Sequence, residues 1–181
     1  MERYTKNGFH PVDLGQVLPL PETCVDSPNK EPRYRIMAKN GFDEFSTVWL
    51  ARDLDEKYMF RFHFFFFKGE ADSLRRWVVV NICCGIEAPQ RSREASILSE
   101  IRETGQGKAG FEQVLELFDD FIIKGPNGFH ECLITEVVAP LTDITVRERS
   151  SVDAVLQVTQ GFALLHEQAI SHGGTLHLGS L

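Results

Sequence analysis

A chain of 181 residues can hold one domain with a hydrophobic core, whereas two full domains would be cramped. Hydrophobic residues make up 43% of the sequence and charged residues 25%, values that exclude wholesale disorder. The formal net charge of -7 argues against a surface that binds nucleic acid, because such binding depends on Lys and Arg side chains that neutralise phosphates.

The cysteines and the N-terminus indicate an intracellular protein with reduced thiols. None of Cys24, Cys83, Cys84 and Cys132 lies in a Cys-x-x-Cys pair, so we expect no zinc site. The segment that begins at Met1 lacks the apolar core of a secretory signal, and no apolar run is long enough to span a membrane. We therefore expect a protein of the cytoplasm and/or the nucleus that makes no membrane contact.

The first half of the chain begins with an arm and a hairpin. Residues 1–32 are rich in Pro, Gly and Asp and contain only short apolar pieces, so we expect an extended arm that lies on the domain. Residues 34–51 contain two β-rich runs separated by a glycine and small polar residues. This pattern predicts a hairpin with a tight turn, which can lie over a phosphate or can be an ordinary surface hairpin.

A phenylalanine-rich segment follows the hairpin. Six of the residues from 58 to 68 are phenylalanine. A strand with two apolar faces is expected only where both faces are buried. In a small domain, such a segment is an aggregation hazard.

Three more strands and one helix are predicted before residue 139. The β-branched residues of 76–84 predict a strand. The helical spacing of Ala95, Leu98 and Ile101 predicts a helix over 92–101. The last two strands form a hairpin that turns at Gly125 to Gly128, over residues 114–123 and 130–138. The sequence therefore predicts an α+β fold in which an antiparallel five-stranded sheet packs against one helix.

The C-terminal part contains one further helix. Apolar residues at helical intervals predict an amphipathic helix from Val152 to Gln168, with Ser151 as its cap. We expect its apolar stripe to be exposed or to fold back on the sheet. Residues 170–181 are rich in glycine.

This order of elements resembles the small lobe of a protein kinase, and four short segments resemble the SR-protein kinases and their fungal relatives. Residues 45–53, Phe-Ser-Thr-Val-Trp-Leu-Ala-Arg-Asp, resemble the glycine-loop segment of that family. Residues 4–15 resemble the arm that precedes its kinase domain. Residues 117–121 and 125–130 resemble its fourth strand and the turn that follows. The resemblance covers almost the whole chain except residues 59–75.

The resemblance implies a domain layout and a chemistry. Residues 1–32 would form the arm, 33–139 the small lobe with an atypical insertion at 58–75, and 140–181 the start of a truncated large lobe that includes the last helix. The insertion is either translated non-coding sequence or a lineage-specific loop. The family transfers phosphate from ATP, with Mg²⁺, to serine in Arg/Ser-rich proteins. The resemblance therefore implies ATP and Mg²⁺ as cofactors and Arg/Ser-rich proteins as partners.

The glycine loop of this chain departs from the family pattern at one position. Gly41 stands at the first glycine and Ser46 at the third, where the family also has serine, but Asp43 replaces the second. We expect the carboxylate of Asp43 to weaken nucleotide binding, because phosphates must approach closely there. Carried over residue by residue, the family's nucleotide contacts fall on Gly41, Phe42, Asp43, Ser46, Val48, Val79, Thr135, Glu136 and Val138.

Further positions of this chain correspond to those that would hold the phosphates and the adenine in the family. Asn81 stands where the family has the strand lysine that pairs with the phosphates. Glu94 fits the helix glutamate that would orient this lysine, and without a cation opposite it we expect a solvated helix carboxylate. Thr135 fits the gatekeeper position, and residues 136–138 fit the hinge that would accept adenine.

The glycine-rich tail resembles a damaged catalytic loop. Gly174 and Thr175 replace the catalytic aspartate with one extra residue, and Ser180 occupies the magnesium-binding asparagine. No Asp-Phe-Gly segment follows within the 181 residues. His172 and His177 are expected to be exposed polar residues, so we expect no metal site. Two interpretations remain: an enzyme of the family by descent, or a catalytically inactive pseudokinase fragment that at most binds a partner.

Overall fold

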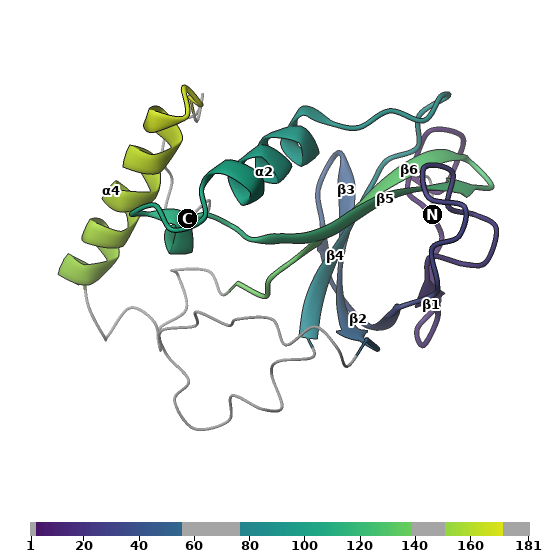
Figure 1. The fold of residues 1–181 in the computed structure, drawn as a ribbon. Helices are drawn as coiled ribbons and strands as arrows, with labels where there is room; N and C mark the ends of the chain where they lie inside the picture. Colours follow the sequence, from purple (N-terminus) through teal and green to yellow (C-terminus); the bar gives the residue numbers. More distant parts are fainter. Residues whose placement is uncertain (1–2, 56–76, 139–150, 172–181) are drawn as a thin grey trace.

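The computed structural model describes residues 3–55, 77–138 and 151–171. Six strands form one antiparallel sheet in the order β1-β2-β3-β4-β6-β5, accompanied by the helices α2 and α4 and the short 3-10 helix η1 (Figure 1). The bounds are β1 Val17–Leu18, β2 Tyr34–Phe42, β3 Ser46–Asp53, β4 Trp77–Cys83, α2 Arg93–Thr104, η1 Phe111–Gln113, β5 Leu117–Gly125, β6 Gly128–Thr135 and α4 Ser151–Glu167.

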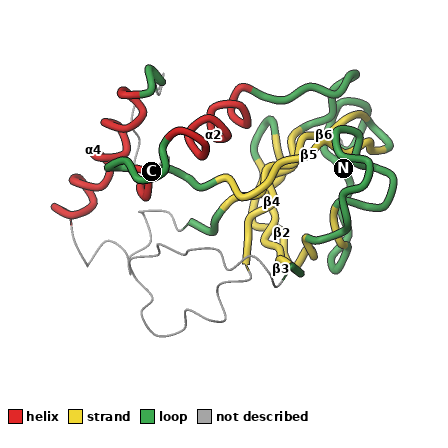
Figure 2. The backbone as a smooth tube through the Cα atoms, viewed as in Figure 1, coloured by secondary structure: helices red, strands yellow, loops and turns green. Residues whose placement is uncertain are grey.

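The α+β fold predicted from the sequence is confirmed, and the arm adds a sixth strand to the five expected. The phenylalanine-rich segment 58–68, the insertion 58–75 and the tail positions Gly174 and Ser180 lie outside the described residues. Figure 2 shows the helices on one side of the molecule and the loops of the arm on the other, with the sheet between them.

Both predicted hairpins are present. β2 and β3 pair up to Phe42 opposite Thr47, and β5 and β6 pair up to Gly125 opposite Gly128. Gly128 has a φ of 145° and a Cβ there would lie 3.0 Å from the carbonyl oxygen of Ile86, so this turn requires glycine.

The sheet has two faces with different partners. The face toward the arm carries the larger hydrophobic core, because alternate residues of every long strand point to it. The opposite face carries a smaller cluster formed with α2. The buried core on the arm side consists of Leu18, Cys24, Tyr34, Ile36, Trp49, Ala51, Val78, Val80, Ile82, Phe121, Ile123, Cys132 and Ile134.

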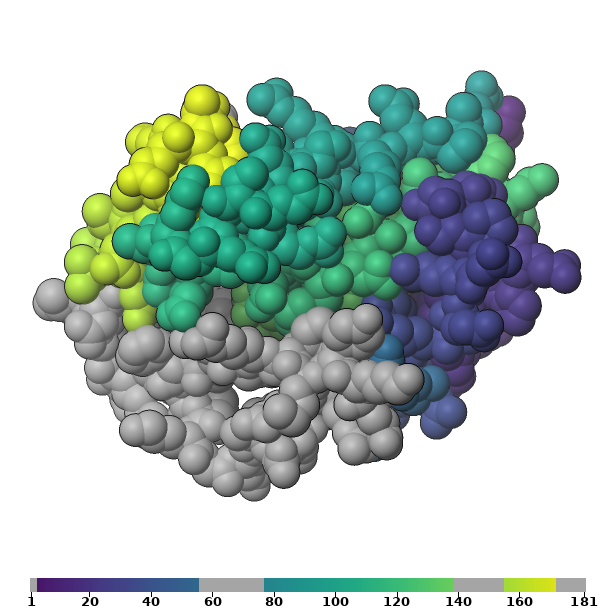
Figure 3. All heavy atoms as spheres, viewed as in Figure 1, coloured from purple at the N-terminus to yellow at the C-terminus, as the bar shows by residue number. Residues whose placement is uncertain are grey.

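The arm connects the two edges of the sheet. At one edge, Val17 and Leu18 pair with β2. At the other edge, Cys24 forms a β-bridge with Ile123, and the N–H of Val25 donates to the carbonyl of Ile122 at 2.9 Å. Atoms of the arm lie against the β5–β6 hairpin in the space-filling view (Figure 3). The arm therefore covers edge strands that would otherwise expose unpaired backbone groups.

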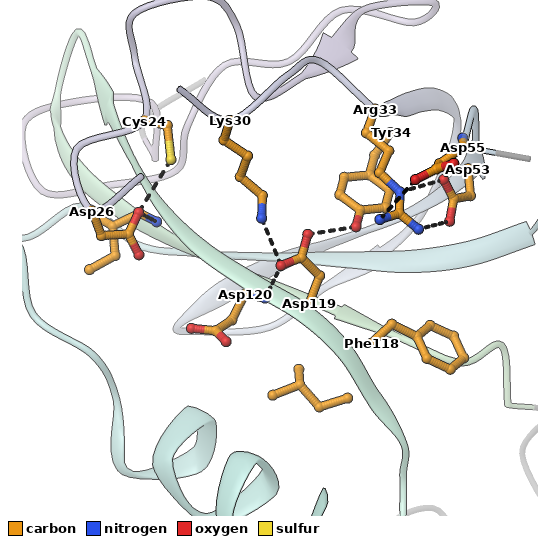
Figure 4. Close-up of polar contacts among 12 residues, drawn as sticks. Cys24, Asp26, Lys30, Arg33, Tyr34, Asp53, Asp55, Phe118, Asp119 and Asp120 are labelled. Atoms are coloured by element: carbon orange, nitrogen blue, oxygen red, sulfur yellow. Dashed lines mark hydrogen bonds and ion pairs between the residues drawn. The ribbon is translucent and has the colours of Figure 1, made fainter. Parts of the chain in front are cut away.

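Side-chain hydrogen bonds hold the end of the arm and the start of β2 to neighbouring strands (Figure 4). The ammonium of Lys30 and the hydroxyl of Tyr34 both donate to the carboxylate of Asp119, each at 2.7 Å. Arg33 donates two hydrogen bonds to Asp53, at 2.7 and 2.6 Å. Burial, together with the negative charge of Asp119, raises the pKa of Tyr34, so its hydroxyl remains a donor.

The helix α2 begins and packs as its sequence predicts. The hydroxyl of Ser92 accepts from the N–H of Ala95 at 3.1 Å, which is an N-cap. Ala95, Leu98 and Ile101 are buried, and Leu117 and Leu133 join the first two in the cluster under the helix. The helix extends to Thr104, one turn beyond the predicted end.

The helix α4 packs on η1 and the end of α2. Leu164 is fully buried, and the hydroxyl of Thr104 donates to the side chain of Gln168 at 2.6 Å. Val155 and Leu156 are 66% and 55% exposed. Val155 of the predicted apolar stripe is thus exposed, as expected, whereas the fully buried Leu164 lies outside that stripe. None of the helices in the described part of the chain has the length and apolar character that a membrane crossing requires.

Candidate nucleotide site

The β2–β3 hairpin carries the positions expected to cover phosphates. Gly41 lies opposite Val48 near the end of β2, and a Cβ at Gly41 would meet nothing within 4 Å. Phe42 is 64% exposed, and its ring lies 6.2 Å from that of Phe9 in the arm. The hairpin therefore presents an open backbone at Gly41 and is held by the arm at Phe42.

The carboxylate of Asp43 closes the turn of this hairpin. Its Oδ1 accepts from the N–H of Phe45 at 2.8 Å, from the N–H of Ser46 at 2.6 Å and from the hydroxyl of Ser46 at 3.1 Å. The N–H of Asp43 donates to the carbonyl of Ser46 at 3.0 Å. The backbone N–H groups of Phe45 and Ser46 therefore donate to the side chain of Asp43 within the same turn.

The arm fixes the hairpin through cations and aromatic rings. The guanidinium of Arg3 donates to the backbone carbonyl of Asp43 at 2.9 Å. The ammonium of Lys39 lies between 5.0 and 5.9 Å from the centres of four rings, within the range of cation–π attraction. Those rings belong to Tyr4, Phe9, Phe42 and Trp49.

The strand positions of the site share the sheet face opposite the arm. Val48 on β3 pairs with Asn81 on β4, and Val79 lies two residues before Asn81, so the three side chains point to the same face. Asn81 is half-buried, and its Oδ1 is buried without a hydrogen-bond partner among the described residues. The structure therefore places Val48, Val79 and Asn81 on one face of the sheet.

Negative groups gather near this face. Partial burial raises the pKa of Glu94, and the charges of Glu131 and Asp43 raise it further, although the side chain of Glu94 is largely exposed. Burial raises the pKa of the Cys83 thiol to about 12, and Glu131 and Glu94 contribute. Among the residues that the structure describes, no Lys or Arg forms an ion pair with Glu94 or Glu131.

Glu131 is the residue that sequence reasoning missed. It lies on β6, is 4% exposed, and accepts the N–H of Ser92 at 2.9 Å. Its second oxygen is buried with no partner within the described ranges. A glutamate directly before the apolar run Cys132 to Ile134 is the signal that could have identified it, because a buried charge without a cation is costly.

The hinge positions are separated from these carboxylates along the sheet. Thr135 is buried and pairs with Val79. Glu136 exchanges hydrogen bonds with Glu116: its Oε1 accepts the N–H of Glu116 at 3.0 Å, and its own N–H donates to the carbonyl of Glu116 at 3.3 Å. Val138 is 58% exposed. Within the described ranges, no group of three His, Cys, Asp or Glu side chains could hold a metal ion.

The residues present do not fit a nucleotide in the way the family pattern requires. Phosphate binding uses a backbone N–H cradle and a cation. Here the N–H groups of Phe45 and Ser46 already donate to Asp43. The strand position at which the resemblance implies a lysine holds the neutral Asn81.

The chain is similar in sequence to known protein kinases. No family model matches the chain. It is 28% identical over 137 residues to human SRSF protein kinase 3, and 30% identical over 142 residues to protein kinase dsk1 of Schizosaccharomyces pombe. These matches cover 75% and 76% of the chain but only 19% and 20% of those proteins, so the chain spans about a fifth of their length.

A third relative is a serine/threonine protein kinase of Aspergillus fumigatus, 26% identical over 136 residues, which cover 75% of this chain and 26% of that protein. Among solved structures, a crystal structure of a kinase domain matches with a TM-score of 0.52 and 12% identity. That match covers 91% of this chain and 40% of the other, and it supports the fold alone. The sequence matches, which cover about three quarters of this chain, support an SR-protein-kinase-like family of serine/threonine kinases, and the kinase-domain structure agrees in fold.

Proposed function

We propose that this chain is a non-catalytic, SR-protein-kinase-like small lobe that does not turn over ATP. The observation that carries the proposal is Asn81. It lies on the same face as Val48 and Val79, where the family has the lysine that pairs with the phosphates, and it is neutral and short.

Three carboxylates on the hairpin, α2 and β6 support the same proposal. Glu94, Glu131 and Asp43 lie close enough that the latter two raise the pKa of Glu94. A polyphosphate in this place would meet negative charge where the family offers a cation. Losing one contact of this kind typically costs about 3 kcal/mol of transition-state stabilisation, which is roughly a hundredfold in rate.

The partner class follows from the resemblance. The relatives include a human SRSF protein kinase, and we propose that this chain contacts Arg/Ser-rich proteins without phosphorylating them. The net charge of -7 suits a basic partner. Because the chain spans about a fifth of its relatives, their activity, cofactors and place in the cytoplasm or nucleus come to it only as part of this proposal.

A nucleotide thermal-shift assay tests the proposal. A ligand that binds the folded state raises the melting temperature. Because we expect ATP not to bind, it should leave the melting temperature of the chain unchanged, with and without Mg²⁺. An Arg/Ser-repeat peptide with radiolabelled ATP gives the second readout, and we expect no transfer. A clear shift together with phosphorylation of the peptide would establish the enzyme interpretation instead.

The variant Asn81→Lys provides a matched control. It restores a cation at the position where the family has the strand lysine, and it leaves the sequence of the β2–β3 hairpin unchanged. If electrostatics at this position limit binding, Asn81→Lys should respond to ATP more than the unmodified chain does.

A further inference from the structure

We propose that Asp43 is a built-in occupant of the phosphate cradle, a carboxylate that permanently fills the anion position of the β2–β3 hairpin. The inference rests on the proposed function, since it gives the atomic reason why the hairpin would not hold a nucleotide. Asp43 would then act by occupying the donors, and the repulsion expected from its charge would be secondary.

The first step concerns the donors. Successive backbone N–H groups in a turn form a concavity that binds anions, and the glycine-rich loop of kinases covers phosphates. In this chain the N–H groups of Phe45 and Ser46 converge on a single oxygen of Asp43, at 2.8 and 2.6 Å. The hydroxyl of Ser46 adds a third hydrogen bond to the same oxygen, at 3.1 Å. An anion is therefore already present where a phosphate oxygen would sit.

The second step concerns competition. Hydrogen bonds to an ionised acceptor are roughly twice as strong as those between neutral groups. A phosphate that entered the turn would have to displace the carboxylate from its donors and then remain beside its negative charge. The side chain of Asp43 is tethered to the same turn, so it returns to these donors at a high effective concentration.

The third step concerns the backbone around the turn. The N–H of Asp43 donates to the carbonyl of Ser46, and Arg3 of the arm donates to the carbonyl of Asp43. Lys39 lies within cation–π range of Phe42, next to Asp43, and of two rings in the arm. The hairpin is thus held in the conformation in which Asp43 reaches its donors.

The test compares four forms of the full chain: unmodified, Asp43→Gly, Asp43→Asn and Glu44→Gln. Glu44→Gln is the matched control, because it removes one charge from the same turn while the carboxylate of Glu44 accepts no hydrogen bond from the two amides. The probe is inorganic tripolyphosphate, measured by isothermal titration calorimetry. Amide hydrogen exchange at Phe45 and Ser46, followed by NMR, reports the donors directly.

We expect Asp43→Gly to speed exchange at both amides and to bind tripolyphosphate about tenfold or more tightly than the unmodified chain. Asp43→Asn keeps an acceptor oxygen without the charge, so both effects should be intermediate, and this variant carries the test if Asp43→Gly does not fold. Glu44→Gln should behave like the unmodified chain.

Three results would overturn the inference. Exchange at Phe45 and Ser46 that is unchanged in Asp43→Gly would show that the carboxylate is not their acceptor. Faster exchange without a gain in tripolyphosphate affinity would show that the freed donors do not form an anion site. An equal gain in tripolyphosphate affinity in Glu44→Gln would show that the gain in Asp43→Gly comes from the change in net charge and not from freed donors. Binding of ATP by the unmodified chain would instead overturn the proposed function, and the exchange data would still report on Asp43.

Discussion

His10, a buried histidine of the arm, makes the free energy of unfolding of the protein depend on pH. His10 is 5% exposed, and its ring lies 4.8 Å from that of His130. Its Nδ1 is buried with no hydrogen-bond partner in the described part of the chain, and a Cβ on Gly125 would lie 2.5 Å from this atom. Burial, and secondarily the neighbouring His130, lowers the pKa of His10 to about 4.

The sign of the effect follows from the protons bound in each state. In the unfolded chain His10 binds a proton below its ordinary pKa of 6.5, whereas in the folded protein it stays neutral down to about 4. The unfolded state therefore binds more protons between these two values, and the free energy of unfolding falls as the pH falls from 6.5 to 4. At about 1.4 kcal/mol per pH unit, the whole interval is worth on the order of 3 kcal/mol, and the part above pH 5 about 2 kcal/mol.

The assay is urea unfolding at pH 7 and pH 5 of the unmodified protein, His10→Gln and a control, His166→Gln on α4. Glu94 and Asp120 have pKa values raised mainly by burial, which favours the folded state as the pH falls, but these contributions are common to all three proteins and cancel in the comparison. Burial also lowers the pKa of His130, whose ring nitrogens lie 2.9 Å from the carbonyl of Cys83 and from the side chain of Asn127, so His130 adds to the loss in each form.

We expect the unmodified protein and His166→Gln to lose about 2 kcal/mol more than His10→Gln between pH 7 and pH 5. An equal loss in all three proteins would refute the reasoning, because it would mean that His10 accepts a proton in the folded state without cost.

Three substitutions test other contacts of the arm and the helix. Tyr34→Phe removes the hydroxyl that donates to Asp119 at 2.7 Å, and urea unfolding should show a loss of about 1–3 kcal/mol, since the carboxylate loses a buried donor. Lys39→Met removes the ammonium from the four rings and should cost about 1 kcal/mol at this exposed site, whereas Lys124→Met on β5 should cost almost nothing. Ser92→Ala removes the cap of α2 and should cost about 1 kcal/mol in the same assay; an unchanged midpoint would mean that the cap contributes nothing.

The sequence was most informative where a pattern repeats along an element. The buried residues of α2 are those at helical spacing, and Ser92 marks its start by a side-chain hydrogen bond that acts within one turn. The long strands are similarly marked by β-branched residues and by the glycines of the β5–β6 turn. Such signals are local, so the fold class could be read from them.

The contacts of the arm could not be read in this way. β1 contains only Val17 and Leu18, which are too few residues to show a period of two. Cys24 forms its β-bridge with Ile123 of β5, which lies 99 positions further along the sequence. Glu131 was missed because its strand was identified by its apolar residues. The hydrogen bond that Glu131 accepts from the N–H of Ser92 depends on how the start of α2 lies against β6.

Asp43 is an intermediate case. The sequence shows that it replaces a loop glycine, and from the sequence alone we expect a repelling charge. Aspartate side chains commonly accept from the N–H two residues later, so the bond to Phe45 could have been predicted from the spacing alone. The additional donors from Ser46 depend on the register of the β2–β3 hairpin.

We propose that this SR-protein-kinase-like lobe has lost its nucleotide site. The most direct measurement is calorimetric titration of the full chain with ATP and Mg²⁺, run beside the double variant Asp43→Gly, Asn81→Lys. We expect no measurable heat of binding for the unmodified chain and a measurable affinity for the double variant, because only the latter offers free N–H donors at Phe45 and Ser46 together with a cation at position 81. Micromolar binding by the unmodified chain would contradict the account.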